Sequence, residues 1–332
     1  MAQRDVNEVG AQSPRTKRSR TPGCDYLAKL HPHPTDEVDM LFDEETHTYT
    51  YRGVQVQKSC TTLVNENFEM FDAWVTVQSF YERWKENQDD RYWDIISCTS
   101  TELEHERIDD NEAQRRIVAR WEACGADASR KGTLLHTYCE RVLNLAPDEL
   151  PLPMEAFTDI VKETTQHAHF MCSNFVATYS LRPYATELLV WFSVDQAIVS
   201  AGQVDAVMQS KETGEFFLID WKRVSKKHEL TPNAHPFANR YGFGECSAIP
   251  DTHFHKYSLQ CSIYATMLNH SHGIDVGARL YLVRMHEDRD NYEVVHCHDW
   301  RSVAPSLLKA EHARLMSKRA QEATQDTPAE ES

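Results

Sequence analysis

The sequence lacks long apolar runs, paired cysteines and an excess of positive charge. No segment approaches the roughly 18 consecutive apolar residues of a membrane helix, and the first 30 residues lack the apolar centre of a signal peptide. We therefore expect an intracellular protein without a membrane-inserted segment. The nine cysteines form no C-x-x-C pair, which favours reduced thiols over a disulfide framework or a zinc ribbon.

The net charge of −16 argues against a protein coated in basic surface, although it does not exclude a local basic groove. A large share of the acidic residues lies within 36–45, 102–112 and the last residues of the chain. Basic residues gather elsewhere: Arg130, Lys131, Lys222, Arg223, Lys226, Lys227 and Lys256. This distribution is compatible with a basic patch on an acidic body.

Composition divides the chain into segments. Residues 1–37 are polar, contain several prolines and show no apolar periodicity, so we expect a disordered tail. Within them the run Pro14 to Arg20 has the composition of a nuclear import signal, or is simply a solvated basic tail. Residues 38–124 are expected to form a β-hairpin plus a helical subdomain, and residues 125–305 the core. A C-terminal helix over 306–322 and a disordered tail over 323–332 are expected to follow.

The helical subdomain is rich in aromatic residues. Trp74, Phe80, Trp84, Trp93 and Trp121 recur amid charged residues at helical spacing, which predicts amphipathic helices. We interpret these rings as core residues, because apolar stripes on helices are usually buried, rather than as a platform on which nucleobases stack.

The second half of the chain changes to strand patterns. Helices are expected over 153–179, 257–270 and 304–322. Strands are expected over 184–194, 197–209, 215–222, 278–286 and 292–298. Helices followed by a run of strands, and then by a helix and strands, predict an α/β protein with a mixed sheet flanked by helices.

Two of these strands carry charged residues where a packed sheet tolerates charge least. Asp205 lies in one, and Asp220 and Lys222 lie in the next. Because side chains alternate along a strand, Asp220 and Lys222 share a face, roughly 7 Å apart between Cα atoms. Converging carboxylates repel each other unless a cation lies between them, and Mg²⁺ prefers oxygen ligands of this kind. The pattern predicts metal-assisted hydrolysis of a phosphodiester.

Further motifs flank these strands in order. A G-T-x-x-H-x-x-x-E pattern contains His136, Glu187 lies in the strand before Asp205, and Q-x-x-x-Y places Gln260 and Tyr264 one helical turn apart. Together with G-x-x-D and D-W-K, this order resembles the PD-(D/E)XK nuclease superfamily. It is most similar to the RecB-type branch, which includes mitochondrial genome maintenance exonucleases. The resemblance spans residues 125–285, and the N-terminal hairpin is similar to members from large DNA viruses and eukaryotes.

The resemblance implies a restriction-endonuclease-like mixed sheet flanked by helices, with an N-terminal β-hairpin and a helical subdomain. It also implies a metal-dependent DNA nuclease, an exonuclease on single-stranded DNA or duplex ends, in which metal-activated water attacks phosphorus. Asp205, Asp220, His136 and the backbone carbonyl of Trp221 would ligate Mg²⁺ or Mn²⁺. Lys222 would hold the attacking water and stabilise the developing negative charge.

The resemblance gives the remaining residues supporting roles. Glu187 would orient a metal-bound water or Lys222. Gln260 and Tyr264 would grip the nucleic-acid strand or brace Lys222. Four basic residues would contact phosphates: Arg130, Lys131, Arg223 and Lys256.

The sequence departs from its relatives in two places. Only Cys261 and Cys297 follow Gln260, whereas some members of the branch carry three cysteines there, so no iron–sulfur cluster is expected. The segment 228–255 is longer than the usual loop, which is typical of a substrate lid or arch. No G-x-x-x-x-G-K-[ST] motif is present, so we expect no nucleotide cofactor, and unwinding would need a partner such as a helicase or a replication or recombination protein.

Two other interpretations remain open. The same fold could serve as a non-catalytic DNA-binding or scaffolding module, although the intact set of Asp205, Asp220 and Lys222 argues against it. In a purely structural protein the set would be coincidental, and no divalent ion would affect the protein. The motifs are compatible with DNA or RNA, with either polarity, and with cleavage at ends or internally.

Overall fold

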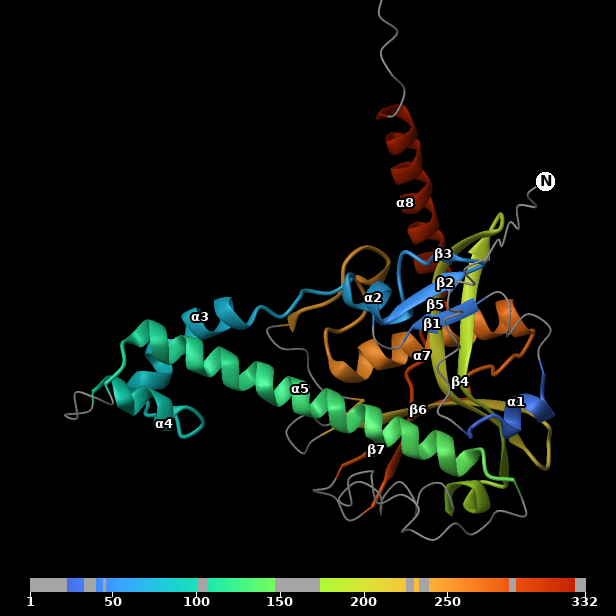
Figure 1. The fold of residues 1–332 in the computed structure, drawn as a ribbon, viewed down its shortest axis with the longest axis horizontal. Helices are drawn as coiled ribbons and strands as arrows, with labels where there is room; N and C mark the ends of the chain where they lie inside the picture. The colour runs from blue at the N-terminus through green and yellow to red at the C-terminus, as the bar shows by residue number, and fades with distance from the viewer. Residues whose placement is uncertain are drawn as a thin grey trace, which may run out of the picture.

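The computed structural model describes residues 23–32, 40–43, 46–100, 107–146, 174–224, 230–232, 239–286 and 291–325. Two sheets form in this part of the chain (Figure 1). The first is antiparallel and contains β1 (Met40–Asp43), β2 (Thr48–Tyr51) and β3 (Val54–Gln55). The second contains β4 (Leu181–Val194), β5 (Ala197–Ser210), β6 (Phe216–Arg223), β7 (Leu280–Met285) and β8 (Glu293–His296). The predicted α/β fold with a mixed sheet and an N-terminal hairpin is confirmed.

The five-stranded sheet follows the chain order from β4 to β8. Asp195 and Gln196 join β4 to β5 with φ values of 47° and 65°, as a two-residue hairpin turn requires. Only β6 and β7 are parallel, and α7 (His253–His272) makes the crossover between them. Thr252 caps α7 by accepting a hydrogen bond from the backbone N–H of His255 at 3.2 Å.

Helices cover both faces of this sheet. On one face α7 packs together with α2 (Cys60–Asn65) and α8 (Ala304–Gln325). On the other face lies the C-terminal half of α5, where Leu135 and Tyr138 contact a cluster that includes Trp221 of β6. The sheet is therefore buried on both sides, and any charged side chain in its central strands lies within the protein.

The helix α5 (Asp110–Leu143) connects the core to a separate group of helices (Figure 1). Its 34 residues run through Gly125 and Gly132, so it crosses the predicted boundary between 124 and 125. Its first part packs against α3 (Ala73–Glu86) and against α4 (Trp93–Ile96), which continues into the short helix η1 (Ser97–Thr99). We call residues 71–99, together with residues 110–121 of α5, the helical arm.

The helical arm has its own small core, to which most of the predicted aromatic residues belong. Trp84 is buried there, whereas Phe80, Trp93 and Trp121 are only partly buried and pack around it. Trp74 departs from the prediction, because 38% of its surface stays exposed.

The N-terminal segment is not wholly without structure, in contrast to the prediction for 1–37. Residues Tyr26–Leu30 form α1, in which Leu27 is buried. The backbone N–H of Leu27 donates to Oδ1 of Asn144 at 3.2 Å, so a contact distant in sequence holds this helix. The basic run Pro14 to Arg20 lies outside the described residues. None of the described helices is both long and apolar enough to span a membrane.

Part of the predicted lid belongs to the core. The described end of the segment 228–255 contains η5 (Gly244–Cys246), and Cys246 and Ile249 are buried. The backbone N–H of Phe243 donates to the carbonyl of Asn67 at 2.8 Å, which joins the segment to the end of α2. Residues 225–229 and 233–238 lie outside the described residues, as does most of the helix predicted over 153–179.

Candidate metal centre

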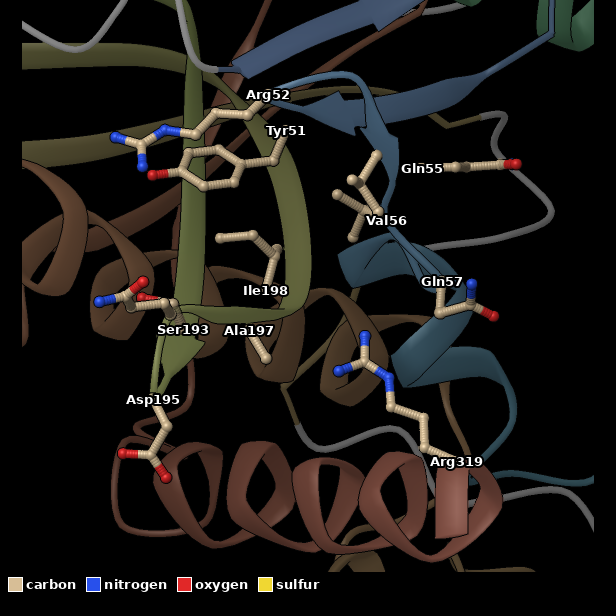
Figure 2. Close-up of a pocket in the computed structure, with 12 residues that line it drawn as sticks. Tyr51, Arg52, Gln55, Val56, Gln57, Ser193, Asp195, Ala197, Ile198 and Arg319 are labelled. Atoms are coloured by element: carbon tan, nitrogen blue, oxygen red, sulfur yellow. The ribbon is translucent and has the colours of Figure 1, made fainter. Parts of the chain in front are cut away.

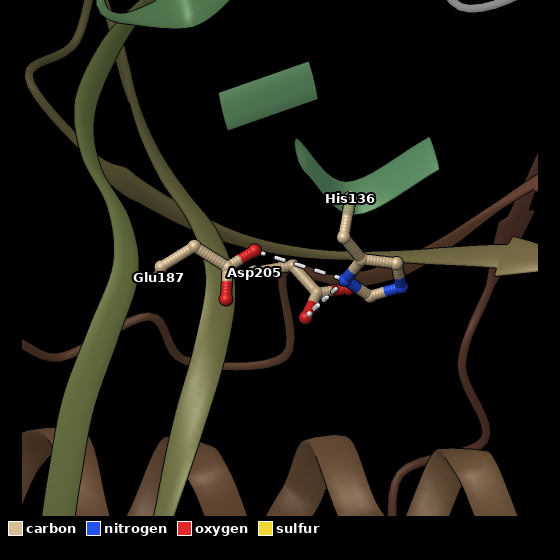
Figure 3. A group of neighbouring side chains, drawn as sticks. All are labelled: His136, Glu187 and Asp205. Carbon is tan, nitrogen blue, oxygen red and sulfur yellow. Dashed lines mark ion pairs between the residues drawn. The ribbon is translucent and has the colours of Figure 1, made fainter. Parts of the chain in front are cut away.

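Three elements bring His136, Glu187 and Asp205 together. His136 lies on α5, Glu187 on β4 and Asp205 on β5. Nδ1 of His136 is 3.4 Å from Oδ1 of Asp205 and 3.7 Å from Oε1 of Glu187 (Figure 3). One ligand atom from each residue lies within 4.8 Å of the other two. An imidazole and two carboxylates therefore converge on one point at the face of the sheet.

The strand register places the two carboxylates opposite each other. Thr186 pairs with Ala206 and Leu188 pairs with Val204, so Glu187 and Asp205 occupy facing positions on β4 and β5. The backbone of Glu187 leaves strand geometry, with a φ of 46°. Non-glycine residues adopt this region rarely, at a cost of roughly 1 kcal/mol or more, and such positions concentrate at functional sites.

Asp220 and Lys222 lie beside this group on β6. Ala206 pairs with Ile219 in the antiparallel pairing of β5 and β6, so Asp205 and Asp220 occupy facing positions on these two strands. Oδ2 of Asp220 is 2.7 Å from Nζ of Lys222, and both side chains are largely buried. Oδ2 of Asp205 accepts a hydrogen bond from the backbone N–H of Trp221 at 2.7 Å, which fixes the orientation of this carboxylate. The site thus contains three carboxylates, an imidazole and an amine.

Burial and charge shift the carboxyl pKa values in different directions. Burial raises the pKa of Glu187 to about 7, although His136 opposes the shift. Burial also raises the pKa of Asp220 to about 6, although Lys222 opposes it. For Asp205 the opposing effect is larger, because His136 and Lys222 outweigh burial and lower its pKa. Asp205 is therefore the carboxylate that keeps its charge most readily.

The two basic side chains of the site are stabilised in their charged forms. Burial alone lowers the pKa of His136, but Asp205 and Glu187 raise it well above its ordinary value. Burial also lowers the pKa of Lys222, but Asp220 and Asp205 outweigh burial and raise it above its ordinary value. The carboxylates around them therefore favour the charged forms of both groups.

The residues present fit a divalent cation. Oε1 of Glu187 is buried and has no hydrogen-bond donor among the described residues, which is costly unless a ligand satisfies it. Two carboxylates and an imidazole are ligand types that divalent cations take in proteins. The group whose ligand atoms lie within 4.8 Å of one another contains Glu187, whereas the sequence predicted Asp220 and Trp221 as ligands beside His136 and Asp205. In the structure Asp220 faces Lys222.

Gln260 and Tyr264 lie on α7 and are buried. Nε2 of Gln260 donates to Oη of Tyr264 at 3.2 Å and to Oγ1 of Thr61 at 3.0 Å. The ring of Tyr264 packs against Gly202 of β5 so closely that a Cβ atom at that position would overlap Cε1 of the ring. These contacts join α2, α7 and the strand that carries Asp205.

The predicted phosphate-binding residues are spread around the site. Arg130 and Lys131, on the exposed part of α5, form ion pairs with Asp127 at 2.8 and 3.1 Å. Lys256 forms an ion pair with Asp251 at 2.6 Å at the start of α7. Arg223 is half-buried at the end of β6.

One site residue escaped the sequence analysis. Tyr257 places its ring centroid 4.7 Å from Nζ of Lys222, in a cation–π contact that helps to hold the amine. Tyr257 lies three residues before Gln260, so the spacing along α7 was a signal that could have found it.

A pocket of about 750 Å³ lies away from this group. The three-stranded sheet, the β4–β5 turn and α8 enclose it, with Arg52, Asp195 and Arg319 among its lining residues (Figure 2). None of the three grouped residues lines it. Pocket size alone therefore does not locate the chemistry of this protein.

Comparisons with known proteins add little to this geometry. No protein-family model matches the sequence, and no curated protein matches it. Fourteen chains of solved structures match. SSO0001 is 13% identical, over 56% of this chain and 87% of that one, with a TM-score of 0.26. A "putative exonuclease" from Eubacterium rectale is 11% identical, over 57% of this chain and 66% of that one, with a TM-score of 0.30. Scores this low carry no functional argument.

Proposed function

We propose that the protein is a divalent-metal-dependent nuclease of the PD-(D/E)XK superfamily that hydrolyses phosphodiesters in single-stranded DNA or at duplex ends. One observation carries the proposal: the ligand atoms of His136, Glu187 and Asp205 lie within 4.8 Å of one another. Beside them Lys222 is paired with Asp220. Burying so many ionisable groups is costly unless they bind a ligand, so a function supplies the physical reason for the cluster.

The chain's own residues divide the work. His136, Glu187 and Asp205 would hold Mg²⁺ or Mn²⁺, with Asp220 next to them. When bound, such an ion supplies a water of lowered pKa and stabilises negative charge on a phosphoryl group. The Trp221 N–H keeps Asp205 oriented towards His136.

Lys222 would act on the reacting groups. Its amine is positioned by Asp220 at 2.7 Å and by the ring of Tyr257. It can donate a hydrogen bond to the attacking water and offset the charge that develops on the phosphoryl oxygens. A fixed donor in a site that excludes water contributes strongly to such stabilisation. DNA is then the partner, and a helicase or another replication or recombination protein would supply unwinding.

The test is cleavage of end-labelled DNA and RNA, single- and double-stranded, with Mg²⁺ or Mn²⁺ and with EDTA. We expect metal-dependent cleavage that falls at least about a hundredfold in Lys222→Gln. Glutamine retains a donor for Asp220, so the fold should survive. The matched control is Lys318→Gln, an exposed lysine on α8, which should cleave like the natural protein.

The outcomes separate the candidate functions. The position of the label gives the polarity, and the preferred substrate gives the nucleic acid. Nucleic-acid binding without cleavage in any metal would refute the nuclease and support a binding module. Cleavage that persists in Lys222→Gln would refute the role of this amine.

A further inference from the structure

The helical arm contains a second candidate binding site. A pocket of about 620 Å³ opens between α3, the segment that joins α3 to α4, and α5. We call this site the aromatic pocket, because the rings of five aromatic residues line it: Phe71, Phe80, Trp84, Tyr92 and Trp121. The proposed nuclease centre uses none of them.

The rings form a layered group with a buried floor and an exposed rim. The ring centroids of Trp84 and Tyr92 are 4.5 Å apart, and both side chains are buried. Trp121 lies 6.0 Å from Trp84 and 5.9 Å from Tyr92. At the rim Phe71 is 72% exposed, yet its ring lies 5.8 Å from that of Trp121. An exposed phenylalanine beside a partly buried tryptophan presents flat apolar faces to a ligand.

Positive charge accompanies the rings. Two arginines and one acidic residue also line the pocket: Arg83, Arg91 and Asp89. Arg91 is held by Asp89, with an ion pair of 2.6 Å, and its guanidinium lies 5.2 Å from the centre of the Tyr92 ring. Arg83 is exposed on α3. Aromatic faces for bases and arginines for phosphates are the two components with which proteins bind single strands independently of sequence.

The pocket and the metal centre share one helix. Trp121 and His136 are 15 residues apart on α5, which corresponds to about 22 Å along its axis and about 60° around it. Of the residues between them, 122–130 are exposed. A stacked strand with a rise of about 3.4 Å per nucleotide would cross this distance in about six or seven nucleotides.

We propose that the aromatic pocket of the helical arm binds nucleobases of a single strand, with the phosphates at Arg83 and Arg91, and directs that strand along α5. The direction rests on the proposed nuclease function, because it assumes that the strand ends at His136. The binding itself does not, because none of the pocket residues belongs to the metal centre.

Binding is tested with the full chain in EDTA, so that cleavage cannot interfere. The probe is a fluorescein-labelled oligothymidylate of about 15 nucleotides, long enough to cover the pocket and the exposed part of α5. We expect Phe71→Ala to weaken binding about tenfold, as the loss of one stacked base predicts. Arg83→Gln should weaken binding and make it less dependent on salt, because one phosphate contact is lost.

Two matched controls separate the pocket from general apolar surface. Met70→Ala changes the residue next to Phe71. Met70 is 78% exposed and does not line the pocket. Tyr179→Ala removes an exposed aromatic ring before β4. Both should bind the probe like the natural protein. Because Phe71 is exposed, its removal should not affect folding, and an unchanged thermal midpoint will verify this.

A small substrate distinguishes failure of this proposal from failure of the nuclease proposal. Bis(p-nitrophenyl) phosphate with Mn²⁺ reaches the metal centre without contacting the arm, so Phe71→Ala should hydrolyse it at the natural rate. Unchanged oligothymidylate binding in both Phe71→Ala and Arg83→Gln would overturn the aromatic pocket as a binding site. Weaker binding in these variants, together with no hydrolysis by any form of the protein, would support the pocket and refute the nuclease.

Discussion

Replacing Asp205 with asparagine tests the metal centre directly, because the change removes one charge and almost no volume. The asparagine oxygen can still accept the hydrogen bond from the Trp221 N–H, so the strand pairing should persist. The imidazole of His136, 3.4 Å away, loses its nearest anionic partner. A divalent ion loses one of two carboxylate ligands, and affinity for hard cations depends strongly on ligand charge.

The expected effect is a change in metal-induced stabilisation. An ion at 100 times its dissociation constant stabilises the folded state by about 2.7 kcal/mol. With an unfolding entropy of about 2 cal/mol/K per residue, a protein of 332 residues should then gain about 4 °C in its melting temperature. We expect this gain with Mn²⁺ in the natural protein and less than about 1 °C in Asp205→Asn. Differential scanning fluorimetry over a series of Mn²⁺ concentrations measures both.

The control is Glu311→Gln, which neutralises a buried carboxylate outside the centre. This variant should have a lower melting temperature without metal but the same gain with Mn²⁺. Comparing gains rather than melting temperatures removes any effect of Asp205→Asn on the metal-free protein. A full gain in Asp205→Asn, or no gain in the natural protein at any Mn²⁺ concentration, would refute the assignment of these residues to a metal site.

Three further predictions concern stability and are measured by urea unfolding. Gly202→Ala should destabilise the protein by about 1–3 kcal/mol, because the new methyl group overlaps the buried ring of Tyr264. Its control, Gly125→Ala, should stabilise the protein by about 0.5–1 kcal/mol, because no side chain or backbone atom lies close to this position in α5. Lys58→Met should destabilise by about 3 kcal/mol, since it removes a cation 2.9 Å from buried Glu311. Burial alone would raise the pKa of Glu311, but Arg314 and Lys58 outweigh burial and lower it. Its stabilising contribution is therefore present at neutral pH and is lost as the pH falls below the ordinary glutamate pKa of about 4.3 and through the lowered pKa of the folded state.

Controls for these predictions come from exposed positions. Lys318→Met removes an exposed cation of α8 and should change stability by less than about 0.5 kcal/mol. Equal effects of Lys58→Met and Lys318→Met would contradict the importance of the buried ion pair. A stability difference between the natural protein and Glu311→Gln that stayed constant between neutral and acidic pH would contradict the lowered pKa. Gly202→Ala as stable as the natural protein would show that the Tyr264 ring can move aside.

Local periodicity alone predicts several contacts of the site. Alternation along a strand places Asp220 and Lys222 on one face, and their side chains indeed meet at 2.7 Å. The spacing of Gln260 and Tyr264 places them on one face of a helix, where they form a hydrogen bond. Such relations depend only on the repeat of a strand or a helix, and they survive whatever surrounds the element.

Long-range packing decided what periodicity could not. We expected a boundary between residues 124 and 125, but α5 continues through it and through Gly125 and Gly132, because Ile117 is anchored in the helical arm and Tyr138 in the core. Packing at both ends outweighs a cost of about 1 kcal/mol for each glycine. The helix α1 forms in a segment of polar composition because Leu27 finds a buried position.

The sequence by itself determined the order of the strands from β4 to β8 and the class of the fold, because both follow from residue type and short-range spacing. Only the tertiary structure decided that Glu187 joins His136 and Asp205 while Asp220 turns to Lys222. That choice depends on the register of β4 against β5 and on where α5 crosses the sheet. The register follows from the turn that joins these two strands, whereas the position of α5 is set by packing between segments far apart in the chain, which no local pattern encodes.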